Sequence, residues 1–197
     1  AEHHDGYAMW DSEVTPWNAK DTGPRRDIVG ELADSIRKKG LKFITTFHHA
    51  RMGKAPSESN ERDKRKWYYY GREKYLERNN PAYEDSDELS KLYGSISWGH
   101  FLQMWNEKLE EVIEKYRPDL IWFDSWLDRI PQKNRIEFVN TYLKAATQWK
   151  KPVVITYKQN DLPQNVGIVD FEKGRLDRLT EYAWLTDDTI SAGVWTE

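Results

Sequence analysis

Hydrophobic positions along the chain follow two alternating patterns, one with helical spacing and one of short apolar runs. Three segments place apolar residues at i, i+3 and i+4 and therefore predict amphipathic helices: 27–39, 101–116 and about 133–147. Each is followed by a run rich in apolar or β-branched residues that predicts a strand: 41–47, 120–123 and 152–157. The spacing of the third helix points four side chains inward: Ile136, Val139, Leu143 and Ala146. Gly40 and Pro118 separate a helix from its strand, as helix stops do.

Helix followed by strand, three times over, predicts an α/β fold with a parallel sheet covered by helices. No glycine-rich phosphate-binding motif follows any of these strands, which disfavours a dinucleotide-binding sheet. The prediction is a partial (β/α)8 TIM-type barrel with about five strands, including one near residues 1–10 and a weak one near 189–195. A closed barrel has eight strands and typically about 250 residues, so residues 1–197 are expected to form a single, incomplete catalytic domain.

A long charged and aromatic stretch, residues 51–95, interrupts the alternation. We interpret it as a solvated βα-loop insertion with short helices. The alternative is a loop that walls a substrate cleft, because long loops within compact domains are often functional.

Composition narrows the function classes. The 197 residues carry a net charge of −3, which offers no electrostatic case for nucleic acid binding. No apolar run approaches the roughly 20 residues that span a bilayer, and without cysteine there is no disulfide, thiolate zinc site or thiol nucleophile. Ten Trp and eleven Tyr fit either an aromatic core or sugar binding, because aromatic faces pack against the C–H faces of sugars.

Candidate chemistry lies where the predicted strands end, since the active site of a barrel gathers at the carboxyl ends of its strands. Asp124 directly follows a buried strand and is the best single candidate, although a helix cap or a salt-bridged loop aspartate would look the same. Asp128 is expected to be a cap or a partner of Asp124. His48, His49 and Lys158 follow two other strands.

The run His3-His4-Asp5-Gly6 places two imidazoles beside a carboxylate at another strand end. Neutral imidazoles can hydrogen-bond sugar hydroxyls, and they can also ligate metals. One enzyme class left open is therefore a metal-dependent barrel hydrolase whose ligands are drawn from these residues: His3, His4, His48 or His49, and Asp124.

Glycoside hydrolysis needs two carboxyl groups, about 5–5.5 Å apart when the anomeric configuration is retained, one of them protonated. Beyond the strand ending near Tyr157 the chain offers five carboxylates, among which sequence physics alone does not choose: Asp161, Asp170, Glu172, Asp177 and Glu181.

Several of these motifs resemble one family. Residues 3–12, His-His-Asp-Gly-Tyr-Ala-Met-Trp-Asp-Ser, closely resemble the His-His-Asp-Gly-Phe signature of the α-L-fucosidases of glycoside hydrolase family 29. Residues 116–124 resemble the family's nucleophile strand, and residues 156–158 and 170–175 resemble a subset of its members. The resemblance covers nearly the whole chain, and residues 51–95 are its least familiar part.

The resemblance implies a retaining exo-glycosidase that hydrolyses α-L-fucosides by double displacement, without a metal or organic cofactor. Asp124 matches the nucleophile, and Glu172 is taken as the acid/base, with Glu181 as the alternative. The implied substrate contacts are His3, His4, Trp122, His48 and Lys158. The implied partner is a fucosylated glycan rather than nucleic acid or a membrane, and most family members act in the periplasm, outside the cell or in lysosomes.

Two departures from the family pattern qualify this expectation. Thr46-Phe47-His48-His49 replaces the usual Tyr-Tyr-Ser, so one sugar contact is changed. The family's first-strand His and its Glu-Trp contact pair are expected to precede residue 1. A third reading, beside the glycosidase and the metal-dependent hydrolase, is therefore a catalytically inactive protein that still binds fucose.

Overall fold

The computed structural model describes residues 1–3, 5–53, 92, 96–124 and 126–189. Nearly all of the predicted insertion at 51–95 lies outside these residues, as do His4 and most of the weak strand expected near 189–195.

Three long helices confirm the helical pattern: α1 (Ile28–Lys38), α5 (Trp98–Tyr116) and α6 (Gln132–Trp149). Asp27 caps the start of α1 by accepting a hydrogen bond from the Gly30 N–H at 2.9 Å. Gly40 follows α1 with a φ of +70°, a backbone conformation that favours glycine. No helix in the described part of the chain is both long and apolar enough to cross a membrane.

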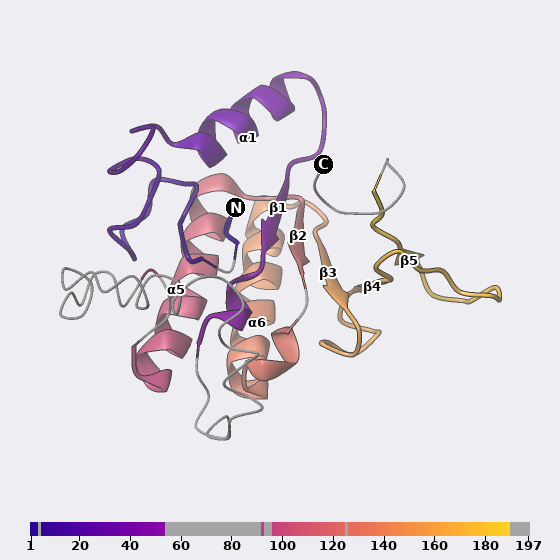
Figure 1. Ribbon diagram of the computed structural model, residues 1–197. Coiled ribbons are helices and arrows are strands. Elements are labelled where there is room, and N and C mark those ends of the chain that lie inside the picture. Colours follow the sequence, from indigo (N-terminus) through magenta and orange to yellow (C-terminus); the bar gives the residue numbers. More distant parts are fainter. Residues whose placement is uncertain (4, 54–91, 93–95, 125, 190–197) are drawn as a thin grey trace.

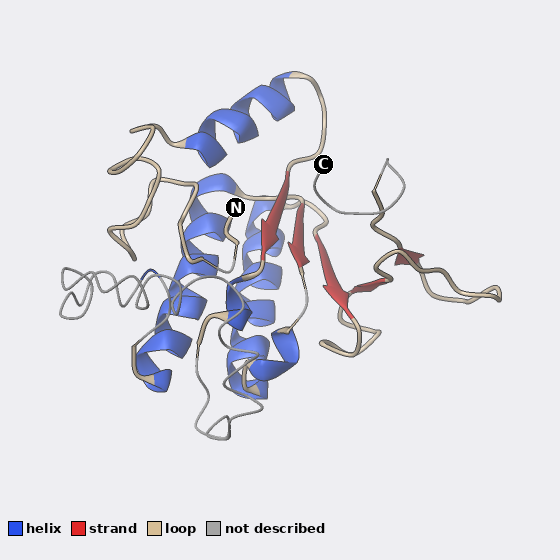
Figure 2. Ribbon diagram, viewed as in Figure 1, coloured by secondary structure: helices blue, strands red, loops and turns tan. Residues whose placement is uncertain are grey.

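The sheet is entirely parallel, with strand order β1-β2-β3-β4-β5. β1 (Ile44–Phe47), β2 (Leu120–Phe123) and β3 (Val154–Lys158) confirm the three predicted apolar strands. β4 (Ile168–Asp170) and β5 (Trp184–Leu185) were not predicted. The segment expected to form a first strand instead makes two isolated bridges, from Glu2 to Phe47 of β1 and from Ala8 to Asn18. Figure 2 shows the first three strands side by side and the two shorter strands, β4 and β5, beyond them.

One face of the sheet packs against α5 and α6, which lie side by side in Figure 1, with α6 behind β1 and β2 and α5 to the left of β1. Phe123 of β2 meets Trp105 of α5 and Phe138 of α6, with ring centroids 6.2 and 5.1 Å apart. Tyr142 extends this cluster from α6 and donates to the Pro118 carbonyl at 3.0 Å. Much of the aromatic content of the chain therefore forms core.

The inward face of α6 differs from the prediction. Ile136 and Leu143 are 51% and 50% exposed, whereas the buried residues of α6 are Phe138, Tyr142 and Ala146. Two large aromatic residues spaced i, i+4 bury more apolar area than Ile136 and Leu143 would, so the helix is rotated to bring the aromatic stripe inward. Along β1, exposed and buried residues alternate.

Phe138→Ala should lower the free energy of unfolding by about 3–5 kcal/mol, because it removes a buried ring and leaves a cavity. Leu143→Ala is the matched control on the same helix and should cost no more than about 1 kcal/mol, since that side chain is half exposed. Urea denaturation of the two variants measures both values. Equal losses would contradict the observed inward face of α6.

Candidate active site

The register of the strands places three polar side chains on the sheet face that points away from the helices. Trp122 pairs with Thr156, and Lys158, two residues further along β3, pairs with Asp170. Successive side chains of a strand alternate between faces, so Trp122, Lys158 and Asp170 share the face opposite Phe123. Asp124 continues the same alternation one residue beyond β2.

Asp124 is held between an imidazole and an ammonium group. Its backbone N–H donates to the Phe47 carbonyl at 3.0 Å, which fixes it at the carboxyl end of the sheet. Its Oδ2 lies 3.2 Å from His48 Nδ1, and its Oδ1 lies 3.6 Å from Lys158 Nζ. The side chain is 27% exposed, so the carboxylate remains accessible to a ligand.

Lys158 is buried and its ammonium is shared by three carboxylates. Nζ lies 2.9 Å from both carboxylate oxygens of Asp187 and 3.2 Å from Glu172 Oε2, in addition to its contact with Asp124. Burial lowers the pKa of Lys158, but these carboxylates raise that pKa by more, so it lies above its ordinary value and the group stays charged. One oxygen of Asp124 and one of Glu172 lie 3.6 and 3.2 Å from the same nitrogen, so those oxygens are at most 6.8 Å apart.

Trp122 is fixed by a buried carboxylate. Its indole N–H donates to Asp170 Oδ2 at 2.7 Å, while the other oxygen of Asp170 accepts the Asp187 N–H at 3.1 Å. Lys158 Nζ lies 5.2 Å from the centroid of the Trp122 ring. Burial raises the pKa of Asp170 to about 6; the Trp122 hydrogen bond opposes this shift and the charge of Asp187 adds to it.

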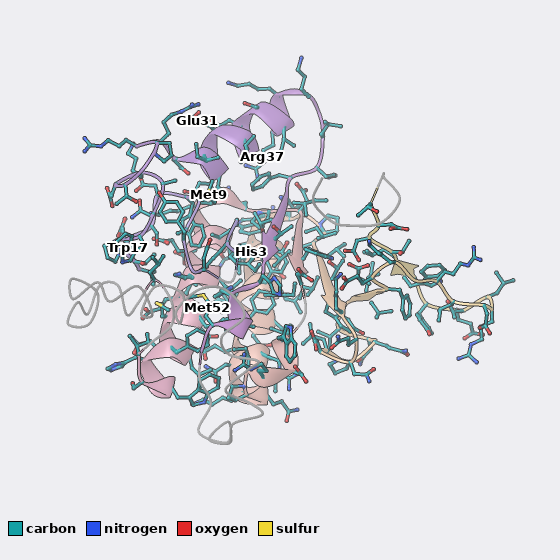
Figure 3. All side chains as sticks on the ribbon, viewed as in Figure 1. His3, Met9, Trp17, Glu31, Arg37 and Met52 are labelled. Atoms are coloured by element: carbon teal, nitrogen blue, oxygen red, sulfur yellow. The ribbon has the colours of Figure 1, made fainter. Side chains whose placement is uncertain are left out.

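The predicted histidines divide between the site and the core. The His3 ring meets the His48 ring edge-on, with centroids 5.1 Å apart, and Figure 3 shows His3 beside β1. His49 begins the short helix η1 (His49–Arg51) and instead stacks on Trp105 in the core at 5.7 Å. Within the residues that the structure describes, no three His, Asp or Glu side chains are arranged to hold a metal ion.

Four other predicted carboxylates lie in loops or in a short helix. Asp161 is buried and accepts the Leu127 N–H at 3.2 Å, which ties the loop after β3 to the short helix η3 (Leu127–Arg129). Asp128 belongs to η3 itself. Asp177 and Glu181 are exposed in the segment that leads into β5, and Glu181 precedes that strand by three residues, at the sheet edge opposite Asp124.

A model of the α-L-fucosidase family matches residues 1–196 of this chain. The chain belongs to the α-L-fucosidase family. Rat tissue α-L-fucosidase is 27% identical over 201 residues, covering 99% of this chain and 37% of the rat protein. Human tissue α-L-fucosidase is 30% identical over 125 residues, covering 62% of this chain and 20% of the human protein. The chain thus spans well under half the length of either fucosidase.

Solved α-L-fucosidase structures share the fold. The Thermotoga maritima α-fucosidase in complex with fucose matches with a TM-score of 0.51 and 20% identity, over 87% of this chain and 36% of that one. A family 29 α-L-fucosidase from Bacteroides thetaiotaomicron matches with a TM-score of 0.54 and 19% identity, over 94% of this chain and 39% of that one.

Asp170 should make the stability of the protein depend on pH. Its pKa is about 6 in the folded protein against an ordinary value of 3.8, so the folded state holds this proton more tightly than the unfolded state. The contribution of Asp170 to the free energy of unfolding therefore falls as the pH rises from 3.8 to about 6, and stays constant above that. Asp170→Asn removes this titration, so its unfolding free energy should decline less between pH 4.5 and pH 7 than that of the wild type.

The control is Asp177→Asn, an exposed carboxylate of the segment before β5. Urea unfolding at the two pH values gives the difference for each protein. An Asp170→Asn variant with the same pH dependence as the wild type would show that Asp170 is already ionised at low pH.

Proposed function

We propose that the protein is a retaining exo-glycosidase that hydrolyses α-L-fucosides, with Asp124 as nucleophile and Glu172 as acid/base. The observation that carries the proposal is the contact of both carboxylates with the Lys158 ammonium, which keeps their nearest oxygens within 6.8 Å. This bound admits the separation of about 5–5.5 Å that retaining glycosidases need, and it overlaps only the lower end of the 6.5–9.5 Å or so of inverting enzymes. Membership of the α-L-fucosidase family supports fucose as the sugar.

The reaction proceeds in two displacements. Asp124 attacks the anomeric carbon and forms a glycosyl ester, while the bond to the leaving oxygen breaks and that oxygen takes the proton of Glu172. Glu172, now ionised, removes a proton from a water molecule, which attacks the same carbon, releases fucose and restores the Asp124 carboxylate. The aglycone leaves as a neutral alcohol and the sugar configuration is retained.

Glu172 suits the acid/base role through its exposure and its position. Its side chain is 47% exposed, which leaves it open to a leaving group and to water. Its Oε2 lies 3.2 Å from the same Lys158 ammonium that contacts Asp124. An acid/base group must reach both the leaving oxygen and the attacking water, and an exposed carboxyl group beside the nucleophile can do so.

Substrate contacts would come from the same sheet edge. The face of Trp122, fixed by Asp170, would pack on the apolar side of the sugar, and imidazole groups suit its hydroxyls. We assign His3, His4 and His48 to these hydrogen bonds, with Lys158 near the ring. The proposed partner is a fucosylated glycan.

We also infer that the sheet is part of a (β/α)8 barrel and that residues 1–197 belong to one catalytic domain. Every strand is parallel to its neighbours, and strands consecutive in sequence are adjacent in space. The polar groups of the site gather at the carboxyl ends of the strands, as they do in barrel enzymes.

Asp124→Gly should reduce kcat on a nitrophenyl fucoside by at least about a thousandfold while the protein stays folded, since each tenfold corresponds to about 1.4 kcal/mol of barrier. Added azide should fill the space left by the carboxylate, restore part of the rate and give a β-fucosyl azide. Asp128→Gly, four residues further along, is the control and should keep most of its activity. Nitrophenol release and NMR of the sugar product measure both effects.

Retention of more than about a tenth of wild-type activity would exclude Asp124 as the nucleophile. A bound metal that disappears in the Asp124 variant would favour the metal-dependent hydrolase instead. A wild-type protein that binds fucose without turnover would favour the inactive binding protein.

Glu172→Ala should slow the cleavage of a fucosylated disaccharide far more than the release of nitrophenol, because a sugar alkoxide needs a proton to depart and nitrophenolate does not. The covalent intermediate on Asp124 should accumulate, since the water then lacks its base, and intact-protein mass spectrometry would detect it. Glu181→Ala is the matched control. A selective loss in the Glu181 variant would transfer the role to Glu181, and equal losses on both substrates would remove Glu172 from it.

A further inference from the structure

A buried ion pair lies behind the candidate active site. The side chains of Glu2 and Lys108 have no solvent exposure, and Lys108 Nζ lies 2.6 Å from Glu2 Oε1. Lys108 belongs to α5, the helix that covers the sheet next to β1 in Figure 1. Withdrawing two charges from water costs several kcal/mol per ion, and apolar replacements of such pairs are often neutral or stabilising. A contribution to folding stability is therefore a weak explanation for this pair.

Lys108 holds both ends of the turn that carries His3. Besides its contact with Glu2, its ammonium donates to the Gly6 carbonyl at 3.1 Å. The Gly6 N–H donates to the His3 carbonyl at 3.2 Å and closes the turn. Gly6 has a φ of +83°, and a Cβ atom there would lie 1.9 Å from the Leu92 carbonyl oxygen. The turn is thus enclosed on one side by backbone and fixed on the other by Lys108.

The same glutamate is in register with β1. The Glu2 N–H donates to the Thr46 carbonyl at 3.2 Å, and the His48 N–H donates to the Glu2 carbonyl at 3.0 Å. His3 follows Glu2 in the chain, and His48 is hydrogen-bonded to the backbone of Glu2. The position of Glu2 therefore fixes the backbone of both histidines. Since His48 Nδ1 lies 3.2 Å from Asp124, a shift of Glu2 would reach the proposed nucleophile through a single side chain.

His49 completes the surroundings of the pair. Its Nδ1 lies 3.9 Å from the second oxygen of Glu2, and burial lowers the pKa of His49 well below its ordinary value, so this imidazole is neutral. Burial raises the pKa of Glu2, and the charge of Lys108 opposes that shift. The ammonium group of Lys108, which donates a hydrogen bond directly to Glu2, therefore provides the positive charge beside this buried carboxylate.

We propose that Glu2 and Lys108 are positioning residues, which fix the directions from which His3 and His48 reach the sugar and Asp124. This role rests on the proposed fucosidase function. Neither residue touches the substrate, so the effect of the pair is on the geometry of the histidines.

The test compares the double variant Glu2→Gln/Lys108→Met with the wild-type protein. The double change removes both charges together, leaves no uncompensated ion, and deletes the hydrogen bonds to Glu2 and Gly6. We expect a folded protein whose kcat/KM on a nitrophenyl fucoside falls at least tenfold, mainly in kcat. Lys115→Met is the matched control on the same helix, because Lys115 also donates to a backbone carbonyl, that of Asp11, and should leave kcat/KM within twofold.

A second variant, Glu2→Asp, guards against misfolding of the first. It keeps both charges but shortens the carboxylate by one methylene, so Lys108 cannot reach Glu2 and Gly6 in the same geometry. We expect a folded protein with kcat reduced at least fivefold. If either variant folds and retains kcat/KM within twofold of the wild type, the positioning role is wrong.

A readout without turnover separates this proposal from the proposed function. The imidazole ¹⁵N resonances of His3 and His48 should shift in the Glu2 and Lys108 variants and stay in place in Lys115→Met, with no substrate present. If the wild type lacks fucosidase activity but these resonances shift, the function is wrong and the positioning holds. If the wild type is active and the resonances do not move, the positioning is wrong and the function stands.

Discussion

The parallel register of the strands is the constraint on which the rest of the structure depends. Hydrogen bonds between neighbouring strands fix which residues lie in one row, and alternation of side chains then sends each row to one face. Phe123 packs into the aromatic core while Trp122 and Asp124, its neighbours in sequence, face the other way. Shifting β2 by one residue would place the Asp124 carboxylate in the core and the Phe123 ring in the site, so core packing and site geometry are specified together.

Two buried lysines organise the polar groups on the two sides of β1–β3. Lys158 extends from the sheet itself toward Asp124, Glu172 and Asp187. Lys108 comes from the covering helix and reaches the His3 turn from behind. In both places a flexible side chain with one charged nitrogen joins groups that are distant in sequence. The site therefore depends on long-range contacts more than on any single loop.

The helices and strands that the sequence predicted correctly are those with a strong local pattern of apolar residues. Helices α1, α5 and α6 and strands β1 to β3 have long periodic or apolar signatures. β4 and β5 have three and two residues, too few for any periodicity, so Asp187 was missed although it follows β5 by two residues. Asp187 could have been found from its position two residues after Trp184-Leu185, but only if those two residues had been recognised as a strand.

The site was predicted unevenly for the same reason. Asp124 follows a strong strand signal, and the structure places it beside His48 and Lys158. The choice of Glu172 among five carboxylates came from the family resemblance, because the distance of a loop residue from Asp124 is set by the tertiary fold. Glu2 and Lys108 are separated by 106 residues, and no local pattern connects them.

The single nitrogen of Lys158 also sets a length scale. Carboxylates that converge on one atom must crowd together, whereas the planar guanidinium of an arginine has several N–H donors directed along separate lines and would hold the same groups further apart. A single ammonium nitrogen in contact with both groups keeps the facing oxygens of Asp124 and Glu172 within 6.8 Å of each other. The choice of lysine at this position thus limits how wide a group can be accommodated between the two carboxylates.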